Sequence, residues 1–130
     1  FTYCILGDGE CCEGSVWEAA MYACQQKLKR LVVIIDQNRV GCDGPLEEMV
    51  QIEPFGRKWS SFGFSVEEVD GHNVTEMDRL FLRLRNECSG PYAVIAHTVK
   101  GYGLTDEIAG TGASHYISGS YKELINKFTF

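Results

Sequence analysis

The fold of this chain is decided by the stretch LVVIIDQN at residues 31–38. Its first five residues are continuously apolar and mostly β-branched, which predicts a strand buried on both faces of a parallel sheet. A second apolar run, Tyr3 to Leu6, is followed in the same way by polar residues, Gly7-Asp8-Gly9. Two predicted strands therefore end beside oxygen-bearing side chains, Asp8 and Asn38, where an open α/β sheet places its ligands.

The rest of the chain alternates between helical and extended patterns. We expect helices at 13–30, 54–62, 73–89 and 121–128, strands at 64–69 and 92–99, and a glycine-rich loop at 100–120. The order β-α-β-loop-α-β-α-β implies right-handed crossovers and a doubly wound, mainly parallel sheet with helices on both faces. The strand ends at Asp8, Asn38, Asp70 and Lys100 are then predicted to share one edge of that sheet.

Length and composition limit the class of protein. The 130 residues suffice for one domain with a real core, and a start at Phe1 suggests a piece of something longer. A formal charge of −6 argues against a broad nucleic-acid surface, and no apolar run approaches the ~20 residues of a membrane span. The six cysteines form no Cys-x-x-Cys pair and predict a reduced, cytoplasmic protein; they are Cys4, Cys11, Cys12, Cys24, Cys42 and Cys88, of which Cys4 lies in a predicted buried strand.

Asp8 and Asn38 are the candidate metal ligands. A carboxylate and an amide oxygen suit a hard divalent cation, Mg²⁺ or alternatively Ca²⁺ or Mn²⁺. The glycines beside Asp8, Gly7 and Gly9, allow close approach of a bulky anion, so the pattern predicts a magnesium ion holding a diphosphate. The competing interpretation is structural, because an Asp between glycines is often a turn residue and an Asn in a loop often forms an Asx-turn.

Several motifs together resemble the thiamine-diphosphate domain of the transketolases, and the resemblance covers nearly the whole chain. Gly7-Asp8-Gly9 is followed by 28 residues, positions 10 to 37, and then by Asn38, close to the family spacing of somewhat under thirty. The continuation EGSVWEAA at residues 13–20 favours transketolase over other thiamine enzymes. Further matches are Asp43-Gly44, Phe62-Gly63-Phe64, Val69-Asp70-Gly71-His72 and Lys100-Gly101-Tyr102-Gly103 followed at a loop's distance by His115.

The resemblance implies roles for individual residues. Magnesium would be bound by the side chains of Asp8 and Asn38 and by the backbone carbonyl of Val40. His115 and Glu13 would be the catalytic residues, His115 reaching cofactor and substrate and Glu13 lying near the partner glutamate that protonates the cofactor. The implied cofactor-binding residues are Gly7, Gly9, Glu13, Asn38, Lys100 and His115. The role of Glu18 stays open, and His72 belongs to a family turn that is structural.

The activity implied by the resemblance is that of a transferase of the pentose phosphate pathway. Such an enzyme uses thiamine diphosphate and magnesium to transfer a two-carbon ketol unit from a ketose phosphate to an aldose phosphate. This chain would supply only the diphosphate and metal half of the site, because the family's activating glutamate comes from a separate pyrimidine-binding domain and its upstream histidines lie before Gly-Asp-Gly. We therefore expect the isolated chain to be inactive, and to act as a homodimer or with a pyrimidine-domain subunit.

Two alternatives remain open. One is another thiamine-dependent enzyme, of the 1-deoxyxylulose-5-phosphate synthase or 2-oxoacid dehydrogenase type. The other is a non-catalytic paralogue that binds the cofactor. Intact Asp8, Asn38 and Lys100 argue against loss of cofactor binding, but they do not decide whether the chain takes part in catalysis.

Overall fold

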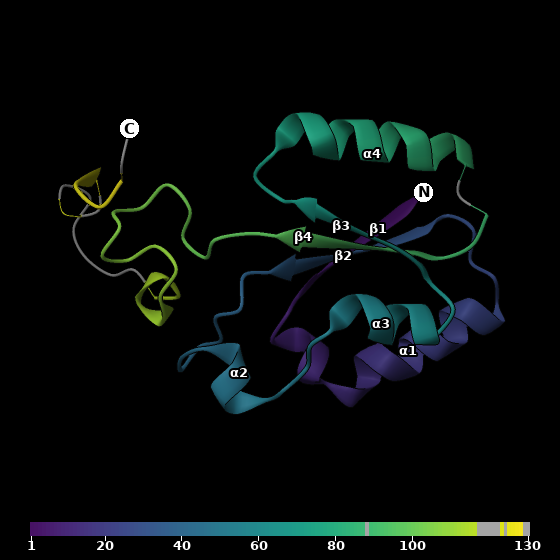
Figure 1. The fold of residues 1–130 in the computed structure, drawn as a ribbon, viewed down its shortest axis with the longest axis horizontal. Coiled ribbons are helices and arrows are strands. Elements are labelled where there is room, and N and C mark those ends of the chain that lie inside the picture. Colours follow the sequence, from purple (N-terminus) through teal and green to yellow (C-terminus); the bar gives the residue numbers. More distant parts are fainter. Residues whose placement is uncertain (88, 117–122, 124, 129–130) are drawn as a thin grey trace.

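The computed structural model describes residues 1–87, 89–116, 123 and 125–128. The strands are β1 (Thr2–Gly7), β2 (Leu31–Gln37), β3 (Ser65–Asp70) and β4 (Tyr92–His97). The helices are α1 (Gly14–Gln25), α2 (Leu46–Met49), α3 (Phe55–Ser61) and α4 (Val74–Glu87), with 3-10 turns η1 (Glu10–Cys12) and η2 (Gly112–Ser114). All strand pairs are parallel and the sheet order is β1-β2-β4-β3 (Figure 1).

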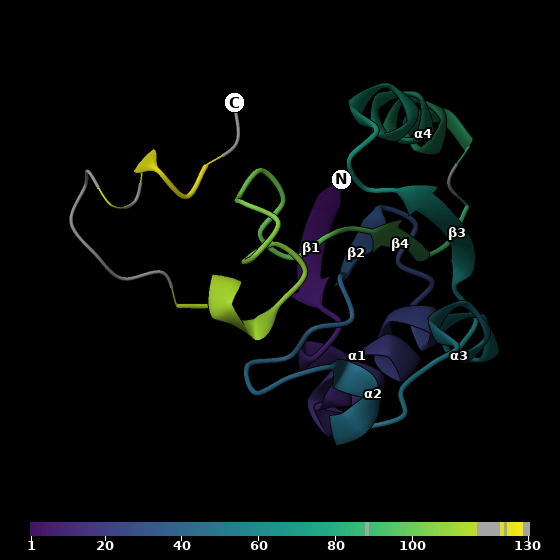
Figure 2. The ribbon, with the colours of Figure 1, turned by 60° about the vertical axis from the view of Figure 1, so that its left-hand side comes forward.

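Helices cover both faces of the sheet. Figures 1 and 2 show α4 on one face and α1 and α3 on the other. Alternation along β2 sends Val33 and Ile35 into the core beneath α1 and α3, and Val32 into the core beneath α4. The predicted strand buried on both faces, and the α/β fold with a parallel sheet and helices on both faces, are therefore confirmed.

Some element boundaries differ from the predictions. Helix α1 ends at Gln25 rather than near Arg30, because Lys27 adopts a left-handed backbone with φ of 51° that a helix does not continue through. Strand β4 ends at His97 rather than Val99. The short helix α2 is an addition to the predicted elements; it starts after Pro45, whose ring removes a donor that the first helical turn does not need. Of the predicted helix at 121–128, residues 121, 122 and 124 lie outside the described residues; positions 123 and 125 are helical, and Phe128 instead forms an isolated antiparallel bridge with Leu104.

Strand β1 corrects one expectation. The apolar run from Tyr3 to Leu6 predicts burial, but Cys4 is exposed and Ile5 is 70% exposed. The reason is the sheet order, which makes β1 an edge strand of the described sheet. An apolar groove of about 350 Å³ lies along it, between Leu6 of β1 and Ala20 of α1.

The carboxyl ends of the strands are in register. Gly7 pairs with Asp36, Asp36 with Ala96, and Asp70 with His97. The predicted shared edge is therefore present, and the segment 98–116 leads away beyond it (Figure 1). Because β4 lies between β2 and β3, Asp70 is at the opposite side of this edge from Asp8.

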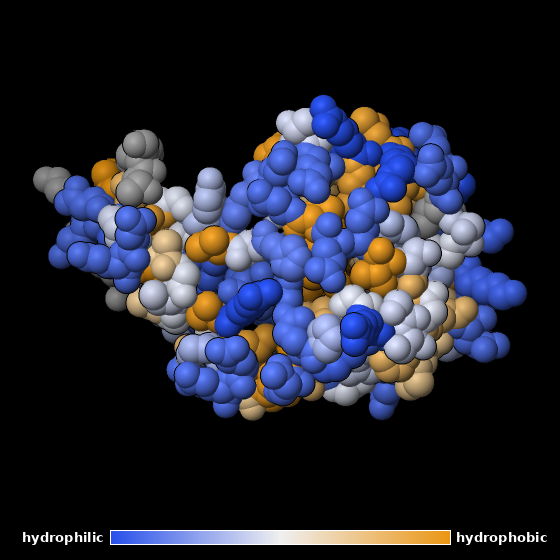
Figure 3. Space-filling model, viewed as in Figure 1, coloured by the Kyte–Doolittle hydropathy of each residue, from blue (hydrophilic) through white to orange (hydrophobic). Residues whose placement is uncertain are grey.

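Hydrophilic and hydrophobic side chains are mixed on the face of the molecule drawn in Figure 3. Figure 3 shows a mostly hydrophilic face with scattered hydrophobic side chains rather than one broad apolar surface. None of the helices that the structure describes is both long enough and apolar enough to cross a membrane.

An ion pair between β3 and α4 makes part of the stability dependent on pH. Arg83 Nη2 donates to both carboxylate oxygens of Glu67, at 2.7 and 2.6 Å, and this contact, with that from Tyr92, lowers the pKa of Glu67 from 4.5. A lowered folded-state pKa adds stability above pH 4.5 that is lost as the pH falls through the folded value. We expect Glu67→Gln to be less stable than wild type in urea unfolding at pH 7, and the difference to shrink in acid. A difference that stayed constant with pH would contradict this.

Candidate functional site

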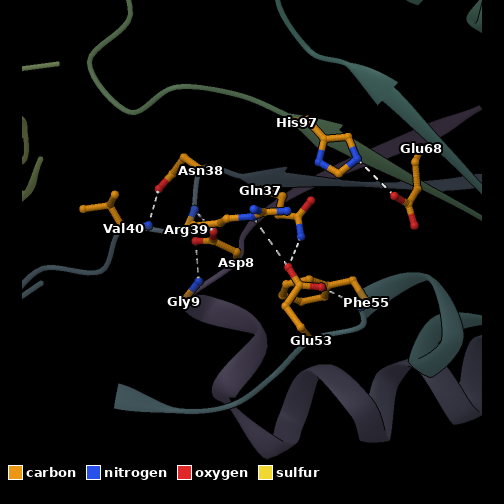
Figure 4. Close-up of polar contacts among 10 residues, drawn as sticks. All are labelled: Asp8, Gly9, Gln37, Asn38, Arg39, Val40, Glu53, Phe55, Glu68 and His97. Carbon is orange, nitrogen blue, oxygen red and sulfur yellow. Dashed lines mark hydrogen bonds and ion pairs between the residues drawn. The ribbon is translucent and has the colours of Figure 1, made fainter. Parts of the chain in front are cut away.

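Asp8 occupies the turn between β1 and η1 and ties two strand ends together (Figure 4). Its side chain is buried, with 2% of the residue exposed. Asp8 Oδ1 accepts the backbone N–H of Gly9 at 2.8 Å, and Oδ2 accepts that of Arg39 at 2.5 Å. The Arg39 contact spans 31 positions of sequence and places the end of β2 against the end of β1.

The environment of Asp8 suits a cation. Burial raises the pKa of Asp8, an effect strengthened by the negative charge of Asp36 and opposed by the backbone N–H groups of Arg39 and Gly9. Loss of water disfavours the charged carboxylate, and the N–H groups only partly offset that cost. A bound divalent ion would supply the missing positive charge at this position.

Asn38 is oriented by its neighbours. Its Oδ1 accepts the backbone N–H of Val40 at 3.0 Å, and its Nδ2 donates to Asp36 Oδ2 at 3.3 Å. The other oxygen of Asp36 accepts the hydroxyl of Thr98, from the end of β4. Because the nitrogen of the Asn38 amide is held by Asp36, the amide oxygen faces Val40, whose carbonyl is another predicted metal ligand.

The turn that joins Asn38 to Val40 has an unusual backbone. Arg39 has φ of 64°, the left-handed region that few residues other than glycine adopt. Two hydrogen bonds hold it there: its N–H donates to Asp8, and its carbonyl accepts the N–H of Leu46 at 2.9 Å. Strained backbone fixed in this way is often found at functional sites.

Lys100 reaches the same turn from beyond β4. Its Nζ donates to the carbonyl oxygen of Val40 at 3.0 Å, across 60 positions of sequence. The structure thus brings a predicted diphosphate-binding residue into contact with a predicted metal ligand. A positive charge already lies at the Val40 carbonyl, which is consistent with a position that attracts cations.

The oxygen atoms present fit a magnesium ion. Asp8, Asn38 and Val40 offer a carboxylate, an amide and a carbonyl oxygen, and each oxygen has a second lone pair beyond its present hydrogen bond. The part of the chain that the structure describes has no cluster of three or more His, Cys, Asp or Glu suited to a metal, but this set needs only one carboxylate. A cleft of about 700 Å³ lies beside Asn38 and Val40, and Gly110 also lines it.

Gly7 and Gly9 leave room at the site. A Cβ atom built on Gly9 would approach nothing closer than Leu46 Cδ1 at 4.0 Å, and one on Gly7 nothing closer than 3.9 Å. The protein's own packing therefore does not require a glycine at either position. Helix α1 begins at Gly14, one short turn (η1) beyond Gly9, so its N-terminus follows the site closely in sequence.

The two predicted catalytic residues lie at the ends of different elements, Glu13 at the start of α1 and His115 at the end of η2. Glu13 is exposed at the N-cap of α1 and makes no capping hydrogen bond there, and Glu18 is exposed on α1. His115 ends η2 and contacts Cys42, which follows Val40 by two positions. The catalytic roles of Glu13 and His115 stay predictions.

His72 has the structural contacts that the sequence indicated. Its Nε2 accepts the backbone N–H of Val99 at 2.8 Å, and its ring stacks on Tyr102 with 3.8 Å between ring centroids. His72 thereby fixes the chain as it leaves β4, which helps to place Lys100.

Sequence reasoning missed four residues of this site. Asp36 lies near the end of β2, two positions before Asn38, so its position at a strand end was an available signal. The other three carry no such signal, because their contacts arise from residues far away in sequence; they are Arg39, Cys42 and Thr98.

Asp36 should act as an outer support of the metal site. We expect Asp36→Leu to weaken magnesium binding by about 10- to 100-fold, because removing such a support frees the ligand it orients. Asp36→Asn should keep most of the affinity, because an amide can accept from Asn38 and donate to Thr98. Calorimetric titration with Mg²⁺ and thiamine diphosphate would measure both, with Asp43→Asn, in the loop that follows β2, as a control for loss of a charge. Equal losses in Asp36→Leu and Asp36→Asn would contradict the orienting role.

Comparisons with known proteins all match this chain to transketolases. Residues 1–123 match the family described as "Transketolase, thiamine diphosphate binding domain". The chain is 40% identical over 104 residues to one subunit of the apulose-4-phosphate transketolase of Phocaeicola vulgatus, covering 80% of this chain and 37% of that protein. It is 43% identical over 104 residues to human transketolase, covering 80% of this chain and 16% of that protein.

Solved structures agree with the sequence comparison. The fold resembles transketolase from Campylobacter jejuni with a TM-score of 0.79 and 28% identity, over 86% of this chain and 17% of that one. Transketolase of Pichia stipitis in complex with sedoheptulose-7-phosphate gives a TM-score of 0.80 and 28% identity, over 88% and 17%. The chain thus spans well under half the length of these relatives.

Proposed function

Because this chain belongs to the transketolase family, as a thiamine diphosphate binding domain, we propose that it holds the cofactor's diphosphate through a magnesium ion bound by Asp8, Asn38 and Val40. One observation carries the proposal. The Arg39 N–H bonds Asp8 and so brings the two halves of the motif, at the ends of β1 and β2, to one point. The oxygen set assembled there has the chemistry that magnesium shares with phosphate groups.

The remaining site residues would serve the diphosphate. Gly9 would let the anion approach the backbone of the turn, because a Cβ there would meet nothing closer than Leu46 Cδ1 at 4.0 Å. Gly7 precedes Asp8 at the end of β1. Lys100 needs only to leave the Val40 carbonyl, or to share it, to direct its ammonium to a phosphate oxygen. The charge of Lys100 and of the metal would together offset that of the diphosphate in an otherwise acidic protein.

We propose a transketolase-type activity for the assembled enzyme: transfer of a two-carbon ketol unit from a ketose phosphate to an aldose phosphate. Thiamine diphosphate, when bound, supplies the carbanion-stabilising chemistry of that reaction. His115 would hold or move a proton at the sugar oxygens, and Glu13 would lie near the acid–base group of the cofactor. The proposed pathway is the pentose phosphate pathway.

This chain would supply one half of the active site, the half that binds the diphosphate and the metal. Two relatives are named as subunits of transketolases: that of the apulose-4-phosphate enzyme, and SqwG of the 6-deoxy-6-sulfo-D-fructose enzyme from a Clostridium species. We propose that the pyrimidine half comes from a partner protein or from further chain, in a dimer. Free thiols at all five described cysteines fit the proposed cytoplasmic location.

Reconstitution tests the proposal. The chain is titrated with thiamine diphosphate and Mg²⁺, with and without a candidate pyrimidine-domain partner, and turnover of ketose phosphate plus aldose phosphate is measured. We expect metal-dependent cofactor binding, and turnover only when the partner is present. Turnover by the chain alone would contradict the half-site, and metal-independent binding would contradict the magnesium site. Reaction with pyruvate instead of a ketose phosphate would favour another thiamine enzyme.

A further inference from the structure

Cys42, to which no role has yet been assigned, meets His115. Cys42 Sγ lies 3.3 Å from His115 Nε2, within hydrogen-bond distance for sulfur. The two residues are 73 positions apart, so their contact joins the loop between β2 and α2 to the segment 98–116. It lies two residues beyond Val40, whose carbonyl is a proposed metal ligand.

The backbone around both residues brings them together. The N–H of Gly41 donates to the carbonyl of Gly44 at 2.8 Å and closes a tight turn around Cys42. Gly112 packs against that turn, since a Cβ built on it would lie 3.5 Å from the Cys42 carbonyl oxygen. The N–H of His115 donates to the carbonyl of Gly112 at 3.0 Å. Backbone packing therefore sets where His115 lies. Its ring is contacted edge-to-face by Tyr116, with 4.6 Å between ring centroids, and its Nε2 is contacted by the Cys42 thiol.

The segment carrying His115 is itself folded back on its start. The N–H of Gly110 donates to the carbonyl of Lys100 at 2.7 Å. Gly101 has φ of 71°, and a Cβ on it would come within 2.6 Å of Ser114 Cβ, so only glycine permits this approach. Lys100 and His115 thus hold the segment to one loop, through Val40 and Cys42.

We propose that Cys42 is a positioning residue for His115. The Cys42 thiol occupies the Nε2 side of the His115 ring and leaves the Nδ1 side for the ligand. In a neutral imidazole the partner of one nitrogen determines which nitrogen carries the proton. A thiol that donates to Nε2 places the ring N–H on Nδ1, where it can donate to an oxygen of the cofactor or sugar. This inference rests on the proposed function, in which His115 reaches cofactor and substrate.

A double-mutant cycle tests the proposal in the enzyme assembled from this chain and its pyrimidine-binding domain. We expect Cys42→Ala to lower kcat/KM for the ketose phosphate by about 5-fold, the worth of one hydrogen bond, and Cys42→Ser to recover part of the loss. In a His115→Ala background, Cys42→Ala should cost nothing further, because Cys42 acts through His115. Cys4→Ala, at another exposed thiol, is the control. Equal losses in both backgrounds, or none in either, would overturn the proposal.

Nitrogen-15 NMR of the His115 ring provides a readout that does not depend on turnover. In wild type Nε2 should show the shift of a hydrogen-bonded acceptor and Nδ1 that of a protonated nitrogen, as fixed by Cys42. Cys42→Ala should move both signals towards an average of the two tautomers, and Cys4→Ala should leave them unchanged. Unmoved signals in Cys42→Ala would overturn the contact. Moved signals together with full activity of His115→Ala would instead show that the proposed role of His115 is wrong, and the positioning role with it.

Discussion

Asp8→Asn is expected to abolish magnesium-dependent binding of thiamine diphosphate while the chain still folds. Asp8 is the single carboxylate of the proposed ligand set, and both of its oxygens lie at the junction of β1 and β2. Replacing it leaves a neutral amide where a divalent ion requires charge. Removing only an outer support of a metal site costs about 10- to 100-fold, so the loss of this ligand should exceed roughly 100-fold. Calorimetric titration with Mg²⁺ and the cofactor measures it.

The folded state of Asp8→Asn should be only modestly altered. One of the N–H groups of Gly9 and Arg39 loses its acceptor, at a cost of about 1–3 kcal/mol, while removal of a buried charge offsets part of that cost. In wild type, saturating cofactor and Mg²⁺ should raise Tm, because ligand at 100 times Kd adds about 2.7 kcal/mol. Asp8→Asn should show no such rise, and Asp78→Asn, an exposed charge on α4, should behave as wild type. Unchanged affinity in Asp8→Asn would remove the basis of the metal assignment.

Trp59→Ala should destabilise the domain by about 3–5 kcal/mol, the usual cost of removing a buried Trp side chain. Trp59 is 1% exposed and lies in the core beneath α1 and α3. Its ring contacts Trp17 and Phe64, with centroid distances of 5.2 and 4.9 Å. A natural domain has only about 5–15 kcal/mol of stability, so this variant should be partly unfolded at modest urea concentrations.

The effect of Trp59→Ala should extend to the site. Trp17 Nε1 donates to the carbonyl of Cys11 at 2.8 Å and so holds η1, the turn that follows Asp8 and Gly9. Trp59→Phe should cost much less, because it keeps a ring in the core and removes an indole N–H that has no hydrogen-bond partner among the described residues. Tyr22→Ala, at a residue 66% exposed, is the surface control. Urea unfolding that gave equal losses for Trp59→Ala and Tyr22→Ala would contradict the packing argument.

Much of the candidate site is readable from short stretches of sequence. The apolar run at 31–35 predicts a buried parallel strand, and Asp8 and Asn38 are placed at strand ends because polar residues follow apolar runs there. Asn73 and Thr75 are both candidate caps for the helix after β3, and it is Asn73 whose Oδ1 accepts the N–H of Glu76 at 3.1 Å. The resemblance to transketolases then adds Val40, whose carbonyl ligand has no signature in its side chain.

The sequence by itself determined the four strands and the helices α1, α3 and α4, and that polar side chains of separate strands share one edge, because hydrophobic periodicity and caps are local properties of the chain. Only the tertiary structure decided that β4 lies between β2 and β3, which leaves β1 exposed at an edge of the described sheet. It also decided three contacts that assemble the site: Arg39 is held in a left-handed turn by Asp8, Lys100 donates to the carbonyl of Val40, and Cys42 contacts His115. These contacts join residues 31 to 73 positions apart. Side chains that distant leave no periodic mark on the sequence, because strand pairing and the packing of loops bring them together.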